Sequence, residues 1–275
     1  MLVGTMAMIA GMASAQTIAP GKGEHSADLL GTKLNVFTYR PAERTPRLVL
    51  VVLHGLNRDA GPYRDNARAL ADKIDAIVVA PEFDKERFST DLYQRGGVAK
   101  DGAFVPPGSR TVDLIQPLIA WARAASGQPD LPSALIGHSA GGQFLSRVAA
   151  FAKTDATRIV IANPSTWVLP STQDAVPYGF GATPTPEQSL QAYLELPITV
   201  LLGGDDTGTH NLSSEPEAVA QGPTRLQRGR NTFAKAEAMA REHGWQFGWT
   251  LAEVPGVGHD SGRMFSSSQA AEAFK

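Results

Sequence analysis

Residues 134–146, ALIGHSAGGQFLS, place a serine between glycines where an apolar run gives way to a helical pattern. Gly137 and Gly141 flank Ser139, so the chain can turn tightly there and a following helix can approach the preceding strand. Such a turn exposes the serine hydroxyl as a nucleophile, and the helix N-terminus beside it favours negative charge. A plain turn is the alternative, and partners elsewhere in the sequence decide between the two.

A nucleophilic serine needs a base within hydrogen-bonding reach and an acid that orients this base. Asp206, in the run LLGGDD, and His259, in the run PGVGHD, each follow a predicted strand. The chain order is therefore serine, acid, histidine, as expected for a strand–turn–helix nucleophile. We predict that Ser139, Asp206 and His259 act together. Asp205 is the alternative acid, and for His259 the other interpretation is a histidine on a surface loop.

Three further polar residues are expected to serve local structure only. Asp260 is interpreted as a loop or helix-cap residue, because adjacent side chains rarely form the hydrogen bond that orients an imidazole. His243 precedes Gly244 at a predicted helix end, which favours a capping role. His54 is expected to brace its loop by hydrogen bonding.

Two backbone N–H groups are needed to hold the negatively charged oxygen of a tetrahedral intermediate. Ala140 follows the serine directly and should supply one of them. The other should come from the loop after the strand that ends in His54-Gly55, with Leu56 as the expected donor and Asn57 beside it.

Strands and helices alternate along the chain. Continuous apolar runs such as RLVLVVLHG (47–55) are typical of strands buried on both faces of a parallel sheet. The alternation predicts βαβ units in a mostly parallel sheet, with ligand-binding loops at the carboxyl ends of the strands. The expected strands are 32–40, 47–55, 76–83, 133–138, 158–162, 198–202 and 246–254, and the expected helices are 63–74, 110–125, 141–153, 226–243 and 261–274.

Residues 163–197 interrupt this alternation with many prolines and several aromatic side chains. We interpret the segment as a lid-like insertion in which Trp167 and Tyr178, with Phe180, line a substrate pocket. Packing of these aromatic rings onto the sheet is the alternative. A second long connection, 207–224, is expected to frame the other side. The arginines that follow it, Arg225, Arg228 and Arg230, are interpreted as a solvated helix start, with an anionic-substrate clamp as the alternative.

Composition excludes several classes of function. The 275 residues carry a formal net charge of -2 and no long basic run, which argues against nucleic acid as a partner. The absence of cysteine excludes disulfides and thiol catalysis, and no pair of histidines has metal-ligand spacing, so neither a metal nor another cofactor is expected. No segment is long and apolar enough to predict membrane insertion.

The N-terminus resembles a truncated signal peptide. Residues 1–15 are apolar and small and end in Ala13-Ser14-Ala15, which favours cleavage before Gln16, although no basic residue precedes Lys22. We therefore expect a secreted or periplasmic protein whose residues 16–275 form a single domain.

Together, LHGLN (53–57), GHSAGG (137–142), GGDD (203–206) and GVGHD (256–260) resemble the motifs of the α/β-hydrolase superfamily, in the same order. Within it, the chain is most similar to exported esterases related to poly(3-hydroxybutyrate) depolymerases and feruloyl esterases. Leu56 stands where those enzymes often have a cysteine. The resemblance implies an α/β-hydrolase fold, a mostly parallel central sheet flanked by helices, and ester hydrolysis by a Ser-Asp-His triad.

The sequence therefore predicts a serine esterase that forms an acyl-enzyme on Ser139 and acts on a small-molecule or polymeric ester. A serine peptidase or an acyltransferase on the same scaffold is the first alternative, and a polyester depolymerase is the second. A non-enzymatic binding protein of this fold is the third, and the intact set of serine, acid and histidine counts against it.

Overall fold

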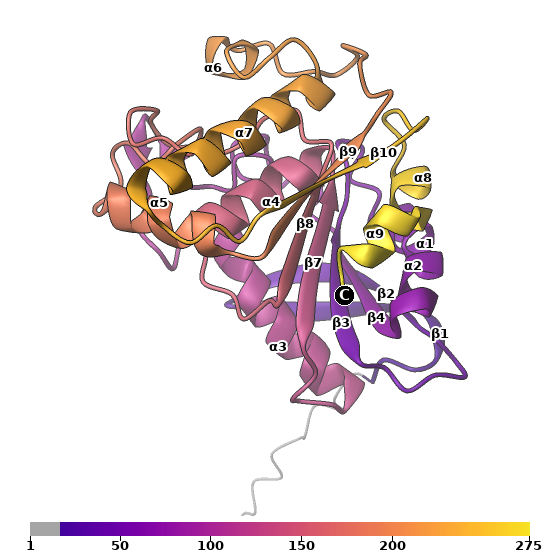
Figure 1. Cartoon of the computed structure of the whole chain (residues 1–275). Helices are drawn as coiled ribbons and strands as arrows, with labels where there is room; N and C mark the ends of the chain where they lie inside the picture. The colour runs from indigo at the N-terminus through magenta and orange to yellow at the C-terminus, as the bar shows by residue number, and fades with distance from the viewer. Residues whose placement is uncertain (1–16) are drawn as a thin grey trace, which may run out of the picture.

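The computed structural model describes residues 17–275, so the predicted signal peptide and its cleavage site lie outside the described part of the chain. An eight-stranded sheet crosses the molecule between two layers of helices (Figure 1). The order of its strands is β1-β2-β4-β3-β7-β8-β9-β10. Their bounds are Gly21–Leu29 (β1), Thr32–Arg40 (β2), Leu48–Leu53 (β3), Ala76–Pro81 (β4), Ser133–His138 (β7), Arg158–Ala162 (β8), Ile198–Gly203 (β9) and Thr250–Val254 (β10).

From β4 to β10 neighbouring strands run parallel, while β1 and β2 form an antiparallel hairpin that joins β4 in antiparallel pairing. The predicted mostly parallel sheet is therefore present. Strand β1, GKGEHSADL, was not predicted, because it alternates polar and apolar residues weakly and most of its side chains are at least partly exposed. The last strand, β10, is shorter than the predicted 246–254.

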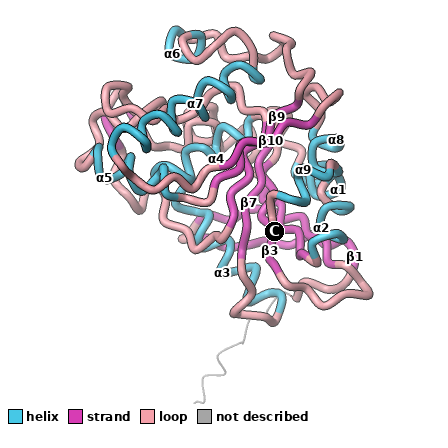
Figure 2. Tube along the Cα trace, in the orientation of Figure 1, coloured by secondary structure: helices cyan, strands magenta, loops and turns pink. Residues whose placement is uncertain are grey.

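Helices cover both faces of the sheet (Figures 1 and 2). One layer holds the short helices α1, α2, α8 and α9, and the other holds the longer α3, α4, α5 and α7. Their bounds are Ala60–Asn66 (α1), Arg68–Ile74 (α2), Ile115–Ser126 (α3, after the 3₁₀ turn η1, Thr111–Leu114), Ala140–Phe151 (α4), Pro186–Glu195 (α5), Pro216–Val219 (α6), Arg225–His243 (α7), Ser261–Ser266 (α8) and Ser268–Glu272 (α9); a small hairpin, β5 (Ala99–Lys100) and β6 (Ala103–Phe104), completes the described elements.

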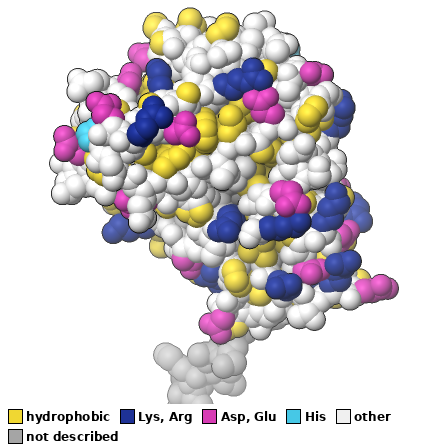
Figure 3. Space-filling model, in the orientation of Figure 1, with side chains coloured by type: hydrophobic (Ala, Val, Ile, Leu, Met, Phe, Trp, Pro, Cys, Tyr) yellow, Lys and Arg dark blue, Asp and Glu magenta, His cyan; other side chains and the backbone are white. Residues whose placement is uncertain are grey.

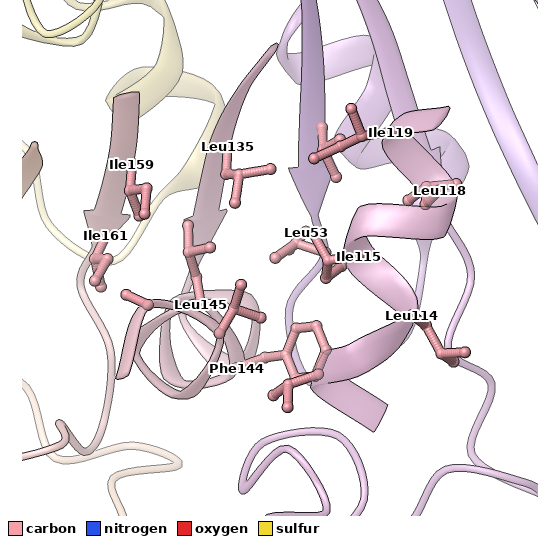
Figure 4. Packing of buried hydrophobic residues seen from close by; sticks show 14 of the residues in the cluster. Leu53, Leu114, Ile115, Leu118, Ile119, Leu135, Phe144, Leu145, Ile159 and Ile161 are labelled. Carbon is pink, nitrogen blue, oxygen red and sulfur yellow. The ribbon is translucent and has the colours of Figure 1, made fainter. Parts of the chain in front are cut away.

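Alternate residues of the buried strands enter different cores, as the two-residue period of a strand requires. Leu50 and Val52 of β3 face the layer of short helices, where they share a cluster with Phe265 of α8. Leu53 faces the opposite layer, where α3 and α4 pack on the sheet (Figure 4). The labelled side chains of that core are Leu53, Leu114, Ile115, Leu118, Ile119, Leu135, Phe144, Leu145, Ile159 and Ile161.

The surface carries charges of both signs. Lys and Arg side chains are interspersed with Asp and Glu over the face seen in Figure 3, and hydrophobic side chains show between them. Within residues 17–275, no helix combines the length and apolar character that a membrane span requires.

The glycines of the motif permit a close approach between helix α4 and the ends of strands β3 and β7. A Cβ atom on Gly141 would collide with the carbonyl oxygen of Leu53 and lie 2.7 Å from that of His54. A Cβ atom on Gly137 would collide with the carbonyl of Gly141 itself. Because backbone atoms cannot yield as flexible side chains do, these positions require glycine.

We expect Gly141→Ala to lower the free energy of unfolding by at least about 2 kcal/mol, because the added methyl group overpacks against backbone. Thermal or urea denaturation measures the effect. Gly208→Ala is the matched control, since nothing lies within 4 Å of a Cβ atom there. Equal stability of the two variants would contradict this steric account.

Candidate active site

Ser139 lies on a strained turn between β7 and α4. Its backbone has φ 59° and ψ -118°, a region that residues other than glycine rarely occupy. The turn is held by hydrogen bonds from the Ser139 N–H to the carbonyl of Ala162, 3.0 Å, and from the Gln143 N–H to the carbonyl of Ser139, 3.0 Å. The predicted turn with a projecting serine is therefore present, with α4 starting directly at Ala140.

The structure brings the three predicted residues together in one hydrogen-bonded row. His259 Nε2 lies 2.9 Å from Ser139 Oγ, and His259 Nδ1 lies 2.7 Å from Asp206 Oδ2. A carboxylate only accepts hydrogen bonds, so Nδ1 carries the hydrogen and Nε2 is free to accept from the serine hydroxyl. The Asp206 side chain is 1% exposed and that of His259 31% exposed, so the row runs from the interior to the surface.

The alternative residues lie elsewhere. Asp205 is exposed, and its backbone N–H bonds to the carbonyl of Val257. Asp260 caps α8 by accepting a hydrogen bond from the Arg263 N–H at 2.9 Å. His243 lies in the last turn of α7, where its ring stacks on Trp245. The geometry thus favours Asp206 over Asp205 as the partner of the histidine.

Asn163, at the end of β8, joins the loops that carry the acid and the histidine. Its side-chain oxygen accepts the Gly203 N–H at 2.8 Å, and its amide nitrogen lies 3.5 Å from the carbonyl of Gly258. Gly203 is three residues before Asp206, and Gly258 directly precedes His259. No sequence motif pointed to this asparagine, because its role depends on loops that meet only in the folded chain.

Arg225 is buried beside the acid, which corrects the interpretation of this arginine as part of a solvated helix start. It is the first residue of α7, its side chain is 2% exposed, and its Nη1 lies 3.6 Å from Asp206 Oδ1. Its Nη2 donates to the carbonyl of His210 at 2.7 Å. Burial lowers the pKa of Arg225, and the charge of Asp206 opposes that shift. The arginine therefore balances a buried carboxylate.

The other two arginines of this helix differ from each other. Arg228 is also buried and donates to the carbonyls of Gly222 and Ser213, so it holds the 207–224 connection in place. Only Arg230 is on the surface, where it pairs with Glu253. A sequence pattern cannot separate these three, because the difference depends on how the long connection folds back over α7.

The two predicted N–H donors, Leu56 and Ala140, line the same cleft as Ser139. Ala140 is the first residue of α4, where backbone N–H groups have no partner within the helix. His54 braces the other loop: its Nε2 accepts the Phe83 N–H at 3.0 Å, and its Nδ1 lies 3.1 Å from the carbonyl of Gly55. Burial lowers the pKa of His54 to about 3, so this imidazole stays neutral.

The cleft over Ser139 has a volume of about 500 Å³ and is largely polar. Arg95 crosses one side, where it pairs with Glu215 at 2.7 Å and lies 3.4 Å from the hydroxyl of Tyr178. These residues come from the 84–108, 163–197 and 207–224 connections. Other residues that line the cleft are Asn57, Asp59, Tyr63, Thr90, Gln94, His138, Gln143, Leu212 and Ser261.

Tyr178 lines the cleft as predicted, but Trp167 does not. The Trp167 side chain is fully buried in the core beneath the 163–197 segment, and its backbone N–H donates to Gln221 at 2.9 Å. Phe180 packs in the same core between Phe151 and Tyr193. The alternative interpretation therefore holds for Trp167 and Phe180, since both side chains are fully buried in the core. Whether the segment acts as a lid remains a prediction.

His138, the residue before the serine, is buried against His259, with 4.6 Å between the ring centroids. Burial, together with the nearby His259 and Arg225, holds the pKa of His138 well below its usual range. A neutral ring thus supports one side of the exposed histidine. Within residues 17–275, no three acidic or histidine side chains gather in the manner of a metal site.

Two solved structures are similar to the chain over nearly its whole length. Poly(aspartic acid) hydrolase-1 from Sphingomonas sp. KT-1 superposes with a TM-score of 0.86 and 33% identity, covering 92% of this chain and 98% of that chain. LpqC, a poly(3-hydroxybutyrate) depolymerase from Bordetella parapertussis, gives a TM-score of 0.86 and 32% identity, with 93% and 90% covered. No protein-family model and no curated protein matches the sequence.

The chain belongs to the α/β-hydrolase superfamily of serine hydrolases. The predicted fold and the resemblance are thereby confirmed, and the protein is a hydrolase. The siderophore hydrolase EstB from Aspergillus nidulans is similar to this α/β-hydrolase in fold alone, with a TM-score of 0.53 and 16% identity over 92% of this chain and 96% of that chain.

For this hydrolase we expect Arg225→Gln to lower the free energy of unfolding by about 3 kcal/mol, because it leaves the Asp206 carboxylate buried without a compensating charge. Chemical denaturation measures the loss. Arg230→Gln on the same helix is the matched control and should leave stability almost unchanged, since that arginine lies on the surface. A similar small effect for both variants would show that Arg225 is not needed to balance Asp206.

Proposed function

We propose that this α/β-hydrolase is a serine esterase that cleaves carboxylic esters through an acyl-enzyme intermediate. The observation that carries the proposal is the row of hydrogen bonds from Asp206 through His259 to Ser139, at 2.7 and 2.9 Å. The row ends at the edge of a cleft, so its serine can meet a bound carbonyl group.

The mechanism follows from the positions of these groups. Ser139 Oγ attacks the ester carbonyl while His259 Nε2 takes its proton, and Asp206 stabilises the imidazolium that forms. The N–H groups of Leu56 and Ala140 hold the negative oxygen of the tetrahedral intermediate. His259 then gives the proton to the departing alcohol, which leaves the acyl group on Ser139. A water molecule, deprotonated by His259, releases the acid and restores the serine.

The many polar groups that line the cleft support a substrate with a polar or short acyl group rather than a long hydrocarbon chain. Its main apolar side chains are Leu56, Tyr63, Tyr178 and Leu212, and amide, hydroxyl and charged groups make up most of the remaining lining. An extended alkyl chain would displace water from these polar groups without replacing its hydrogen bonds. Short esters and polymers with a carbonyl group in every repeat both fit this lining.

A second candidate is the hydrolysis of amide bonds in a polymer. It is favoured by the 33% identity to poly(aspartic acid) hydrolase-1, because poly(aspartic acid) is a polyamide. The similar identity to a poly(3-hydroxybutyrate) depolymerase favours esters instead. The same serine, histidine and acid serve both reactions, so the leaving group distinguishes the candidates.

The purified protein should hydrolyse p-nitrophenyl butyrate, and Ser139→Ala should lower kcat by at least about 10⁴-fold, because nothing else replaces the nucleophile. The matched p-nitroanilide tests the amide candidate in the same assay. A fluorophosphonate probe should label the wild-type protein on Ser139 and leave the variant unlabelled. Full ester hydrolysis by Ser139→Ala, or no hydrolysis and no labelling of the wild type, would overturn the proposal.

The two neighbouring aspartates provide a matched pair of variants. Asp206→Asn should lower kcat by about 10³- to 10⁴-fold, because an amide at this position favours the wrong tautomer of His259. Asp205→Asn should keep kcat within about twofold, since that side chain is exposed and does not contact the imidazole. A larger loss from Asp205→Asn than from Asp206→Asn would assign the acid to the other residue.

A further inference from the structure

Tyr63 of helix α1 reaches the point where three loops of the site meet. Its side chain is buried, with 8% exposed, and it lines the cleft beside Ser139. No motif in the sequence singles this tyrosine out, because it belongs to an ordinary helical pattern. The proposed mechanism above does not use it.

The Tyr63 hydroxyl contacts one residue from each of these loops. It lies 3.2 Å from Nδ1 of His138, which directly precedes Ser139. It also contacts the backbone of Gly55, which directly precedes Leu56, so closely that a Cβ atom on Gly55 would collide with it. Ser261, two residues after His259, is the third neighbour; it lines the cleft beside Tyr63 and is close enough to act on the pKa of its hydroxyl.

The neighbours of the Tyr63 hydroxyl are themselves held by further contacts. The side-chain amide of Asn66 donates to Ser261 Oγ at 2.9 Å, which fixes the start of α8 beside Tyr63. The His138 ring, whose Nδ1 lies 3.2 Å from the Tyr63 hydroxyl, packs in turn against the ring of His259.

Burial raises the pKa of Tyr63, while the neighbouring polar groups of Ser261 and Gly55 oppose the rise. The phenol therefore stays protonated and keeps its donor hydrogen. Its ring has a separate role, because it packs edge-on against Phe265 of α8, with 6.1 Å between ring centroids. A phenylalanine at this position would keep that packing and lose only the hydroxyl.

We propose that Tyr63 is a positioning residue whose hydroxyl sets the oxyanion loop at Leu56 against the nucleophile at Ser139 and the loop of His259. This role rests on the ester hydrolysis proposed above and deepens it. The Leu56 N–H must be aimed at the oxygen of the tetrahedral intermediate, which forms only after Ser139 attacks. The hydroxyl therefore matters for the transition state more than for the bound substrate.

We expect Tyr63→Phe to lower kcat for p-nitrophenyl butyrate by roughly 10- to 100-fold, because a small displacement of reacting groups has an effect of this size. KM should stay within about twofold, since the lost interaction acts mainly on the transition state. A trifluoromethyl ketone that forms a tetrahedral adduct with the serine should lose affinity by the same factor as kcat/KM. A purely structural tyrosine would move neither kcat nor this affinity.

Tyr193→Phe is the matched control. Tyr193 is also buried, its hydroxyl contacts Ser146 and the carbonyl of Val168, and it lies outside the cleft. Both variants should lose a similar small amount of thermal stability, yet only Tyr63→Phe should lose kcat. Unchanged kcat in a folded Tyr63→Phe protein, or an equal loss in Tyr193→Phe, would overturn the proposal.

Ser261→Ala gives a second, independent test that keeps the tyrosine in place. It removes one of the three contacts from a partly exposed position, and we expect kcat to fall by about threefold with KM unchanged. If Tyr63→Phe does not fold, unchanged kcat in Ser261→Ala overturns the proposal.

The two proposals fail in different ways. If the wild type hydrolyses the ester and Ser139→Ala does not, the proposed function holds, and the Tyr63 variant alone decides the positioning role. If the wild type neither turns over esters nor reacts with the fluorophosphonate probe, the proposed function fails and the positioning role fails with it.

Discussion

The backbone of Ser139 is held at a positive φ because helix α4 touches the ends of β3 and β7 backbone to backbone, and only glycine fits on either side of it. This contact fixes where the hydroxyl projects and where α4 begins. It brings the Ala140 N–H next to the serine and sets His138 against His259. If the helix stood further from the strands, the serine would lose its strained turn and the neighbouring donor together. The other contacts of the site therefore depend on the close packing of α4 against the ends of β3 and β7.

The buried acid of the site has a partner on each side, one buried and one exposed. Asp206 is almost fully buried, and its two oxygens face different partners, His259 on one side and Arg225 on the other. The histidine has the neutral ring of His138 behind it, so it meets no second cation there. A buried carboxylate without a cation would be costly, and a second charged imidazole would oppose protonation of the first. In the proposed mechanism, these surroundings favour transfer of one proton between Ser139 and His259.

The cleft, in contrast, is built from connections between the regular elements. Arg95, Tyr178 and Glu215 come from three different connections and meet on one side of it. Connections vary more readily than the sheet, so one scaffold can take different substrates. The two similar solved structures are named for different polymers, a polyamide and a polyester, although each is about one third identical to this chain. Many of the residues that line the cleft above the row of hydrogen bonds belong to these connections.

The sequence by itself determined the alternation of strands and helices, the order of Ser139, Asp206 and His259, and the glycines around the serine, because each is a local pattern with a direct physical cause. It did not reveal β1, whose polar alternation is too weak to mark an edge strand. Only the tertiary structure decided that Asp206 and not Asp205 faces the histidine, that Trp167 is buried, and that Arg225 lies beside the acid. It alone brought Tyr63 to the site. These findings share one reason. The direction in which a side chain faces in an irregular connection depends on distant segments that pack against it. A local sequence pattern contains no information about that packing.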